Sequence, residues 1–407
     1  MTVNLPLKTL IVLGTRPEAV KLLPVIRLLE TDDRFSTRVA VTGQHREMVD
    51  QILEPFGVVP RDHLDIMQQG QSLNEIVCRV MPRLNALYSE AGPALVMVQG
   101  DTTSAFCAAL AAFQLGIKVA HVEAGLRSYN RFHPYPEEAN RRMISACADL
   151  HFAPTEVSAD NLVKEGVARD EIYITGNTTV DSLLLTLANR ELLEERNVPL
   201  EIHGDGRLVL ITVHRRESWS PRKSVEAEKD FLPLEEIFEA IREAAQDYSQ
   251  VDFVYPVHKN PRVGGPARRI LAGMKNVHLL DPLPYFPFVG LMAKATAILT
   301  DSGGIQEEAP SLGVPVLVLR ETTERPEGLA AGTSRLVGTH PSKIRKELRL
   351  ILDAPPVRPE KIPCPNPFGD GKAAERIRQA ILHSLGLGGR PEEFWQASLP
   401  PSQGFSF

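Results

Sequence analysis

The sequence predicts a two-domain α/β protein in which each domain has a parallel sheet covered by helices on both faces. Two observations indicate this fold class. Short apolar runs alternate with helix-length amphipathic segments along most of the chain. The alternation pauses in the polar stretch Asn197–Arg207, which contains a proline and two glycines, and then restarts. Because 407 residues are enough for two to three domains, we place the domain boundary near residue 200.

The first domain, residues 1–200, begins with an apolar run that is too short to span a membrane and is expected to form a strand. The strands expected in this domain are Lys8–Leu13, Arg38–Thr42, Ala94–Gln99, Lys118–His121, His151–Ala153 and Ile172–Thr175. The amphipathic segments expected as helices include Glu18–Glu30, Thr102–Leu115, Glu137–Ala148 and Val180–Arg196.

The second domain, residues 201–370, repeats the alternation. Its expected strands are Leu208–Val213, Asp252–Pro256, Val277–Leu280, Ala295–Thr300 and Pro315–Leu319. A charged addition at 218–233 separates a strand from a helix and is longer than most such loops. A last helix is expected at 371–385, and the tail 386–407, rich in Gly, Pro and Ser, is predicted to be mobile.

Polar motifs follow the expected strands where each strand ends. Ligands of doubly wound sheets bind at this carboxyl edge, so the two edges predict a ligand site in a cleft between the domains. The motifs of this kind are Gly14–Glu18, Gly100–Thr103, His121–Gly125, Thr212–Glu217, Tyr255–His258 and Asp301–Gly304.

The segment Asp301–Glu308 is the most informative of these motifs. The glycines Gly303 and Gly304, beside Ser302, let backbone N–H groups approach a ligand at the positive end of a helix, which predicts a diphosphate cradle. Glu308, about one turn further on, is placed to accept hydrogen bonds from ribose hydroxyls. The competing interpretation is an ordinary Asp/Ser N-cap with glycines for tight packing.

Carboxylates are the candidate acid/base groups. Asp101 precedes a helix, where an N-cap is equally consistent with the sequence, whereas Glu123 lies between a strand and a glycine and has no capping role. Glu137 and Glu138 open a helix; neighbouring helical residues point about 100° apart, so at most one of them is expected to face a cleft.

Several cationic side chains are candidates for binding a ligand, and each could instead be an ordinary solvated surface charge. Arg16 and Lys21 flank the start of the first helix, and His214 lies beside two arginines, which fits either a phosphate-binding group or a surface cluster. No Walker A sequence, GxGxxG or metal-ligand spacing occurs, so ATP, dinucleotides and metals are not expected.

The composition of the chain narrows the range of functions further. The net charge of −6 with no basic stripe argues against nucleic-acid binding. Four cysteines without CxxC spacing indicate a reducing compartment, and we expect a cytoplasmic protein that binds no membrane.

Eight motifs occur in one order and carry a resemblance. They are Gly14–Glu18 with Lys21, Gln44–Met48, Gly100–Thr103, His121–Ser128, Pro136–Arg141, His214–Ser218, Asp301–Glu308 and Thr323–Glu327. On these motifs the chain resembles, from about Lys8 to Ile381, the non-hydrolysing UDP-N-acetylglucosamine 2-epimerase family of bacterial type.

The resemblance implies a fold like that of GT-B glycosyltransferases, with two Rossmann-like domains, a cleft between them and a last helix that crosses back to the first domain. It implies reversible epimerisation of UDP-GlcNAc to UDP-ManNAc with no metal and no nicotinamide. UDP leaves C1, 2-acetamidoglucal forms, and UDP adds back after C2 is reprotonated on the other face. The product would supply donors for cell-surface polysaccharide, and the pathway stays open.

By resemblance, the site residues take separate roles. Asp101, Glu123 and Glu137 form the acid/base set, without an assignment of which removes and which returns the proton. His214 and the N–H groups of Ser302–Gly304 stabilise the leaving diphosphate. Arg16 binds UDP, Lys21 supports the carboxylates or the leaving group, and Glu308 holds the ribose.

The resemblance also implies a homodimer and a second, activating UDP-GlcNAc site. Gln44, Arg215 and His258 match positions used there. Glu47 and Gly70 stand where some members carry Gln and Arg, which puts strong activation in doubt. Hyperbolic forward kinetics, with a reverse reaction that does not depend on UDP-GlcNAc, would contradict such a site.

Four rivals remain at this stage. A GT-B glycosyltransferase shares the fold but needs only one base, and a hydrolysing epimerase would release free ManNAc. A sister epimerase would act on a C6-oxidised or di-N-acetylated UDP sugar. A catalytically dead sugar-nucleotide sensor is disfavoured by the complete acidic set.

Overall fold

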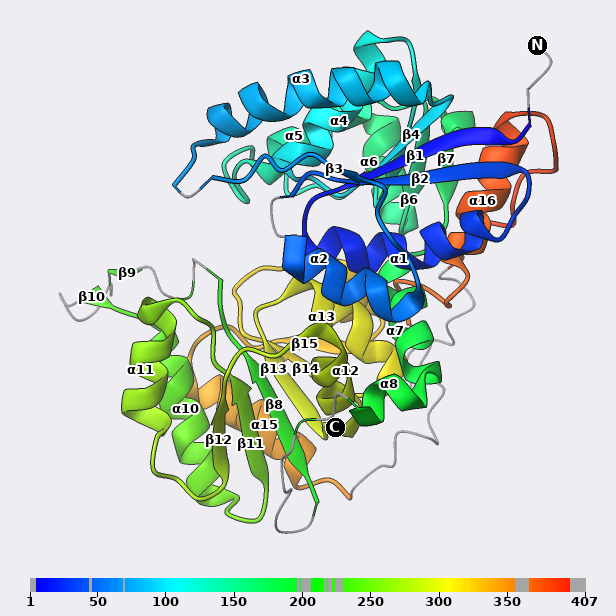
Figure 1. The fold of residues 1–407 in the computed structure, drawn as a ribbon. Helices are drawn as coiled ribbons and strands as arrows, with labels where there is room; N and C mark the ends of the chain where they lie inside the picture. Colours follow the sequence, from blue (N-terminus) through cyan, green and yellow to red (C-terminus); the bar gives the residue numbers. More distant parts are fainter. Residues whose placement is uncertain are drawn as a thin grey trace. The chain divides into compact units, whose positions relative to one another are not determined.

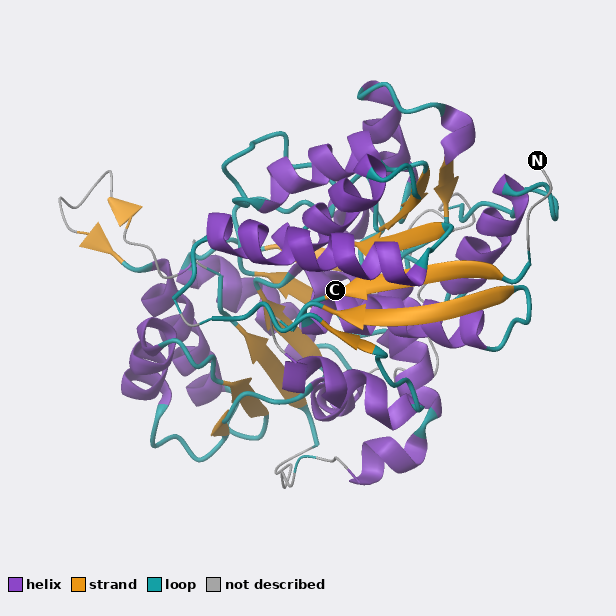
Figure 2. Ribbon diagram, turned by 45° about the horizontal axis from the view of Figure 1, so that its top comes forward, coloured by secondary structure: helices purple, strands orange, loops and turns teal. Residues whose placement is uncertain are grey.

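The structure is a computed structural model that describes residues 5–43, 46–68, 70–195, 198, 206–215, 218, 222–223, 230–355 and 366–395. The chain divides into two compact units. Unit 1 comprises Met1–Leu185 and Phe368–Ser398, and unit 2 comprises Thr186–Pro367 and Leu399–Phe407. The first division therefore falls at residue 185, before the residue 200 expected from the sequence. Each unit contains a sheet with helices packed against it (Figures 1 and 2).

The sheet of unit 1 has the strand order β3-β2-β1-β4-β5-β6-β7, and all its pairs are parallel. Its strands are β1 (Leu7–Leu13), β2 (Phe35–Val41), β3 (Asp62–His63), β4 (Leu95–Gln99), β5 (Lys118–Val122), β6 (Leu150–Ala153) and β7 (Ile172–Ile174). Every residue of β4 is buried, as expected for a central strand covered on both faces. All six predicted strands are present, and only the two-residue edge strand β3 was missed, because so short a run has no pattern.

The helices of unit 1 are α1 (Arg16–Glu30), α2 (Arg46–Leu53), α3 (Leu73–Ala91), α4 (Thr103–Gln114), α5 (Glu137–Cys147), α6 (Glu156–Lys164), α7 (Thr178–Ala188) and α16 (Ala373–Ser384), with short 3₁₀ turns η1 (Glu54–Phe56) and η2 (Arg169–Glu171). Helix α3 starts at a capping box formed by Ser72 and Glu75. A buried cluster of apolar side chains joins α3 and α4 to the strands beneath them.

Unit 2 has a six-stranded parallel sheet of order β12-β11-β8-β13-β14-β15. Its strands are β8 (Leu208–Thr212), β11 (Asp252–Pro256), β12 (Val277–Leu280), β13 (Ala297–Thr300), β14 (Val316–Val318) and β15 (Ser334–Leu336). The five predicted strands appear, and the edge strand β15 was not predicted. The short pair β9 (Arg222–Lys223) and β10 (Asp230–Phe231) lies within the charged addition, most of which is outside the described residues.

The helices of unit 2 are α8 (Arg190–Glu195), α10 (Pro233–Asp247), α11 (Pro261–Leu271), α12 (Tyr285–Lys294), α13 (Gly303–Glu308), α14 (Pro326–Ala330) and α15 (Pro341–Leu352), with the 3₁₀ turn η3 (Ala309–Leu312). The apolar faces of α10, α11 and α15 form one buried core with the strands. In the part of the chain that the structure describes, no helix is long and apolar enough to cross a membrane.

The chain returns to unit 1 at Phe368, and α16 then packs on α1 (Figure 1). The segment after α16 lies along β7, where the Phe394 N–H donates to the Ile174 carbonyl at 2.8 Å. The first part of the tail expected to be mobile is thus docked on a sheet edge that would otherwise expose unpaired backbone groups. Residues 396–407 lie outside the described part of the chain.

Strand order determines where a site can form. The order reverses between β1 and β4 in unit 1 and between β8 and β13 in unit 2. Connections leave in opposite directions at such a switch point and open a crevice at the carboxyl ends of the strands. The motifs after β1 and β4 therefore lie together in unit 1, and those after β8 and β13 lie together in unit 2.

Candidate active site

Glu123 is the most constrained carboxylate of unit 1. It directly follows β5, has a left-handed backbone with φ of 64° and is 9% exposed. Lys21 pairs with its Oε1, Gln99 donates to its Oε2, and the Asn177 side chain donates to Oε1 at 3.2 Å. A non-glycine residue keeps this backbone conformation only where its surroundings hold it, and such strain concentrates at functional sites. Lys21, which sequence reasoning left between two roles, contacts the carboxylate directly.

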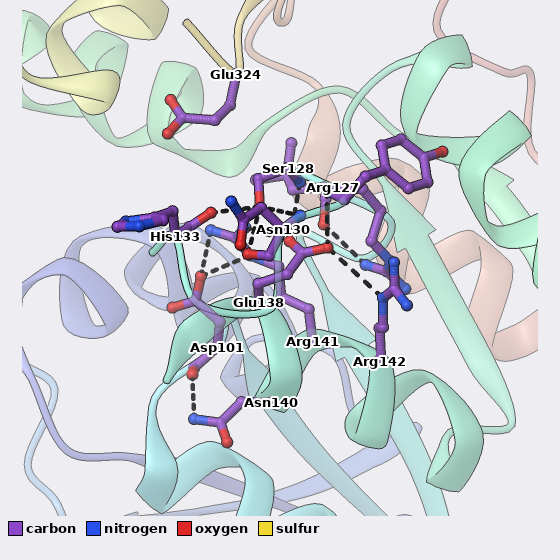
Figure 3. A network of polar contacts seen from close by, with 12 residues as sticks. Asp101, Arg127, Ser128, Asn130, His133, Glu138, Asn140, Arg141, Arg142 and Glu324 are labelled. Atoms are coloured by element: carbon purple, nitrogen blue, oxygen red, sulfur yellow. Dashed lines mark hydrogen bonds and ion pairs between the residues drawn. The ribbon is translucent and has the colours of Figure 1, made fainter. Parts of the chain in front are cut away.

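Asp101 follows β4 and does not cap α4. The capping side chain is that of Thr102, which accepts from the Ala105 N–H at 3.0 Å. The Asp101 carboxylate instead accepts from Nε and Nη2 of Arg141, both at 2.8 Å, and the Asn140 side chain holds its carbonyl at 2.8 Å (Figure 3). The capping alternative is therefore wrong for this residue. Asp101 is a half-exposed carboxylate oriented by an arginine.

The adjacent acids Glu137 and Glu138 differ completely in their surroundings. Glu138 is fully buried and accepts from the backbone N–H groups of Ser128 and Tyr129 at 2.9 and 3.1 Å and from Arg141 at 3.1 Å (Figure 3). It is fully occupied in holding the loop before α5. Within the described residues, the buried Oε2 of Glu137 has no hydrogen-bond partner. A buried oxygen without a partner is costly, so Glu137 is suited to take a donor from a ligand.

Glu18 is a site residue that sequence reasoning missed. Its Oε2 accepts from the N–H groups of Gly14 and Thr15 at 2.9 and 2.6 Å, and its Oε1 accepts from the Thr102 hydroxyl at 2.8 Å. Burial raises the pKa of Glu18, although these hydrogen bonds oppose the shift. The carboxylate thereby ties the loop after β1 to the loop after β4. A Glu in the first turn of a helix, directly after a proline, was the available signal.

The loop after β1 also needs its glycine. A Cβ at Gly14 would lie 2.3 Å from the Thr42 hydroxyl, so no larger residue fits without displacing that side chain. Arg16, the first residue of α1, is exposed and is therefore accessible to a ligand at the switch point.

His121 supports the same region from inside the sheet. The ring is fully buried on β5, and its Nε2 is 2.8 Å from the carbonyl of Gly100, the residue before Asp101. Burial lowers the pKa of His121 to about 4, so the imidazole is neutral near pH 7 and Nε2 is the donor to this carbonyl. His121 begins one of the polar motifs found in the sequence, but nothing there indicated that its side chain supports the loop before Asp101.

In unit 2, Asp301 anchors the loop that carries His214. The fully buried Asp301 carboxylate accepts from the N–H groups of His214 and Arg215, each at 2.9 Å, and from the Ser218 hydroxyl at 3.0 Å. The His214 Nδ1 lies 3.3 Å from it, and the ring stacks on His258 with centroids 5.9 Å apart. The competing interpretation of Asp301 as an N-cap is therefore wrong, because its side chain joins β13 to the loop after β8.

The glycine motif opens α13 as predicted from the sequence. The two glycines differ in the space that a side chain would have. A Cβ on Gly303 would lie 2.7 Å from the guanidinium carbon of Arg325, whereas one on Gly304 would meet nothing within 4 Å. Ser302 makes no capping hydrogen bond with its side chain, and its N–H donates to the Thr300 hydroxyl at 2.9 Å. The helix N-terminus is thus open at Gly304, and Arg325 supplies a cation beside Gly303 that sequence reasoning missed.

Two further expected residues lie in unit 2. Glu308 is 6% exposed and accepts from the Tyr285 hydroxyl at 3.2 Å. Arg215 lies 3.7 Å from Glu324. Burial alone would raise the pKa of Glu324, but Arg320 and the other arginines around it lower the pKa to about 2. Gln44 lies outside the described residues, so only Arg215 and His258 of the expected second site are located, both near His214.

The site contains no built metal centre in the part of the chain that is described. No group of three or more His, Cys, Asp or Glu side chains there is arranged to hold a metal ion. The arrangement offers carboxylates held by cations and amides in unit 1, and an open helix N-terminus with an anchored histidine in unit 2. Such groups suit proton transfer and the binding of an anion, respectively.

Comparisons with known proteins agree with this chemistry. A family model described as UDP-N-acetylglucosamine 2-epimerase matches residues 27–382. A UDP-N-acetylglucosamine 2-epimerase of Escherichia coli (strain K12) is 47% identical over 384 residues, which cover 93% of this chain and 99% of that relative.

Two solved structures are similar over nearly the whole chain. UDP-GlcNAc 2-epimerase from Neisseria meningitidis, bound to UDP-GlcNAc, has 42% identity and a TM-score of 0.83, covering 93% of this chain and 100% of that one. The Methanocaldococcus jannaschii UDP-GlcNAc 2-epimerase in complex with UDP-GlcNAc and UDP has 32% identity and a TM-score of 0.73, with the same coverage. The predicted fold class, two Rossmann-like units of GT-B type, is confirmed. The chain belongs to the UDP-N-acetylglucosamine 2-epimerase family.

Proposed function

We propose that this chain interconverts UDP-GlcNAc and UDP-ManNAc by inverting C2 of the sugar through elimination and re-addition of UDP. Its relatives of up to 47% identity are UDP-N-acetylglucosamine 2-epimerases, which makes the chain an isomerase of that class. The observation that carries the mechanism is the set of three carboxylates at the switch point and helix start of unit 1, each in a different environment.

The reaction needs the proton at C2 to become removable. No carbonyl is attached to C2, so the C1–O bond to UDP breaks as the proton leaves. The electrons of the C2–H bond form the C1=C2 double bond of 2-acetamidoglucal, and the C1–O pair leaves with the diphosphate. Return of a proton to the opposite face of C2, with addition of UDP at C1, gives the epimer. Two acid/base groups on opposite faces satisfy this requirement.

We assign the proton transfers to Asp101, Glu123 and Glu137. Asp101 and Glu123 are each held by a cation, Arg141 and Lys21 respectively, which fixes the orientation that a base needs. Glu137 has a buried oxygen without a hydrogen-bond partner among the described residues, which suits a group that exchanges a proton with the sugar. The pH dependence of the forward and reverse reactions tests which group removes the C2 proton and which returns it.

We assign UDP to groups of unit 2 together with Arg16. His214 and the N-terminus of α13 offer a donor and a helix dipole to the leaving diphosphate, and Arg16 offers a positive charge. Arg325 beside Gly303 is ion-paired with Glu307 and supports the start of the helix. Glu308 is proposed to bind the ribose, in which case the Tyr285 hydroxyl helps to orient its carboxylate. No metal is assigned to the reaction, because these groups supply the positive charge that the leaving diphosphate requires.

Three further features are proposed on the resemblance alone. These are a homodimer, a cytoplasmic location, and activation by UDP-GlcNAc at a second site that includes Gln44, Arg215 and His258. The test of activation is whether the reverse reaction, from UDP-ManNAc, accelerates when UDP-GlcNAc is added.

Proton NMR of the purified protein with UDP-GlcNAc in deuterated water tests the function. We expect UDP-ManNAc to accumulate to equilibrium, with deuterium at C2 of both epimers. Free ManNAc with UDP would instead indicate a hydrolysing enzyme. Absence of exchange would contradict the proposal for this substrate, and a panel of C6-oxidised and di-N-acetylated UDP sugars would then separate a sister epimerase from a transferase.

A further inference from the structure

The side chain of Asn177 connects Glu123 to the point where the chain returns to unit 1. Asn177 is 2% exposed, and its Nδ2 donates to Glu123 Oε1 at 3.2 Å. Its Oδ1 accepts from the Thr179 N–H at 3.0 Å at the start of α7, and its own N–H donates to the Phe368 carbonyl at 2.7 Å. One residue thus contacts the candidate acid/base group with its side chain and the return segment with its backbone.

The return segment is packed too closely to move independently of Asn177. Gly369 follows Phe368, and a Cβ there would lie 3.2 Å from Val180 Cγ2 and 3.3 Å from the Asn177 carbonyl oxygen. These distances leave little room for a Cβ, so glycine lets the segment lie close to Asn177, and the hydrogen bond from the Asn177 N–H to the Phe368 carbonyl couples the two. Glu123 in turn has a strained backbone, and the orientation of its carboxylate depends on the groups that hold it.

We propose that Asn177 is a positioning residue that sets the orientation and ionisation of Glu123 according to the placement of the return segment Phe368–Gly369. The inference rests on the proposed function, in which Glu123 is an acid/base group. The chain passes through unit 2 between Thr186 and Pro367, so the return segment is covalently continuous with that unit and reaches the carboxylate through the hydrogen bonds of Asn177.

Asn177→Asp is the most informative variant. Aspartate keeps the oxygen that accepts from Thr179, but it replaces the Nδ2 donor with a second carboxylate oxygen about 3 Å from Glu123 Oε1. Like charges at this distance cannot both ionise readily, so the pair retains a proton to a higher pH. The charged groups that act on Glu123 include Lys21 of α1 and, when protonated, His121 of β5. Asp181 of α7 faces the backbone of α16 instead.

The activity test is the pH dependence of kcat/KM for UDP-GlcNAc. In Asn177→Asp we expect the limb of the pH profile that reports Glu123 to move upward by about one pH unit. We also expect kcat to fall by a larger factor than the factor by which KM changes. Asn276→Asp is the matched control, because Asn276 donates to three backbone carbonyls of unit 2 and the substitution weakens the fold elsewhere. The control is expected to lower the Tm and leave the pH limbs in place. Unchanged limbs in Asn177→Asp would overturn the proposal.

A second variant covers the case in which Asn177→Asp does not fold. Gly369→Ala leaves every side chain of the site intact and pushes the return segment against Asn177 by a few tenths of an ångström. We expect it to lower kcat at least about fivefold with little change in KM, as for an interaction made only in the transition state. Wild-type kcat and pH limbs in this variant would overturn the coupling.

A measurement without turnover separates this inference from the proposed function. The protein is labelled with ¹³C at the glutamate side-chain carboxyls, and the Glu123 signal is assigned with Glu123→Gln. Its titration midpoint is expected to rise in Asn177→Asp, and an unchanged midpoint overturns the inference. If the wild-type protein does not epimerise UDP-GlcNAc, the proposed function fails while this titration still decides the role of Asn177.

Discussion

Acid is expected to destabilise unit 1 through His121, and the loss of stability follows from the lowered pKa of this buried ring. Burial lowers the pKa of this ring from 6.5 to about 4. Above pH 6.5 the histidine is neutral in both the folded and the unfolded chain and contributes no pH dependence. Below pH 6.5 the unfolded chain binds a proton that the folded chain does not, so stability falls with pH until the folded ring protonates near pH 4.

The magnitude follows from the difference in pKa. One pKa unit corresponds to about 1.4 kcal/mol, so the shift from 6.5 to about 4 limits the loss to about 3 kcal/mol. At pH 5 the linkage relation gives a loss of about 2 kcal/mol. This is a large share of the about 5–15 kcal/mol by which folded proteins are typically stable.

Urea unfolding of the wild-type protein and His121→Gln at about pH 8 and about pH 5 tests this value. Glutamine keeps an N–H donor for the Gly100 carbonyl but does not titrate. Because the other titrating groups are common to both proteins, the wild type should lose about 2 kcal/mol more than the variant on acidification. An equal loss in both proteins would refute the calculation, and with it the neutral state assigned to His121.

Three other predictions follow from the contacts of the site. Lys21→Met leaves Glu123 buried without its cation, so it should cost about 3 kcal/mol of stability by urea unfolding and lower kcat about 100-fold by NMR turnover. A variant with wild-type kcat would exclude a catalytic role for the lysine. Gly303→Ala should lower the Tm and weaken the UDP binding measured by calorimetry, because its Cβ would meet Arg325. The Tm of Gly304→Ala should not fall, because its Cβ would lie in open space, and equal Tm losses in the two variants would contradict this difference in packing. Asp301→Ala removes the acceptor of two backbone donors and should cost about 2 kcal/mol and weaken UDP binding about tenfold; unchanged affinity would show that the loop after β8 keeps its conformation without this carboxylate.

The strands and the positions of the motifs were predictable because they depend on local pattern. A continuous apolar run such as Leu95–Gln99 is typical of a strand buried on both faces, and the motif at Ser302–Gly304 opens a helix as its glycines indicated. The strands that were missed in the two large sheets, Asp62–His63 and Ser334–Leu336, are short and lie at sheet edges. Edge strands carry less apolar signal because one side lacks a neighbouring strand.

The roles of individual acids could not be predicted from local pattern. Glu137 and Glu138 are equivalent in sequence, and only the fold brings the Ser128 and Tyr129 amides to Glu138. Asp101 and Asp301 each stand where an N-cap is the simplest interpretation. In the structure, both carboxylates contact residues far away in the chain instead.

The sequence by itself determined two parallel α/β units, the start of a helix at Ser302–Gly304, and the family. These depend on periodicity and on motifs that are contiguous in the chain. Tertiary structure alone decided that Lys21, Gln99 and Asn177 converge on Glu123, across separations of 102, 24 and 54 residues. Hydrogen bonds and ion pairs require an approach within a few ångströms, and for residues so far apart only the packing of the whole unit can provide it.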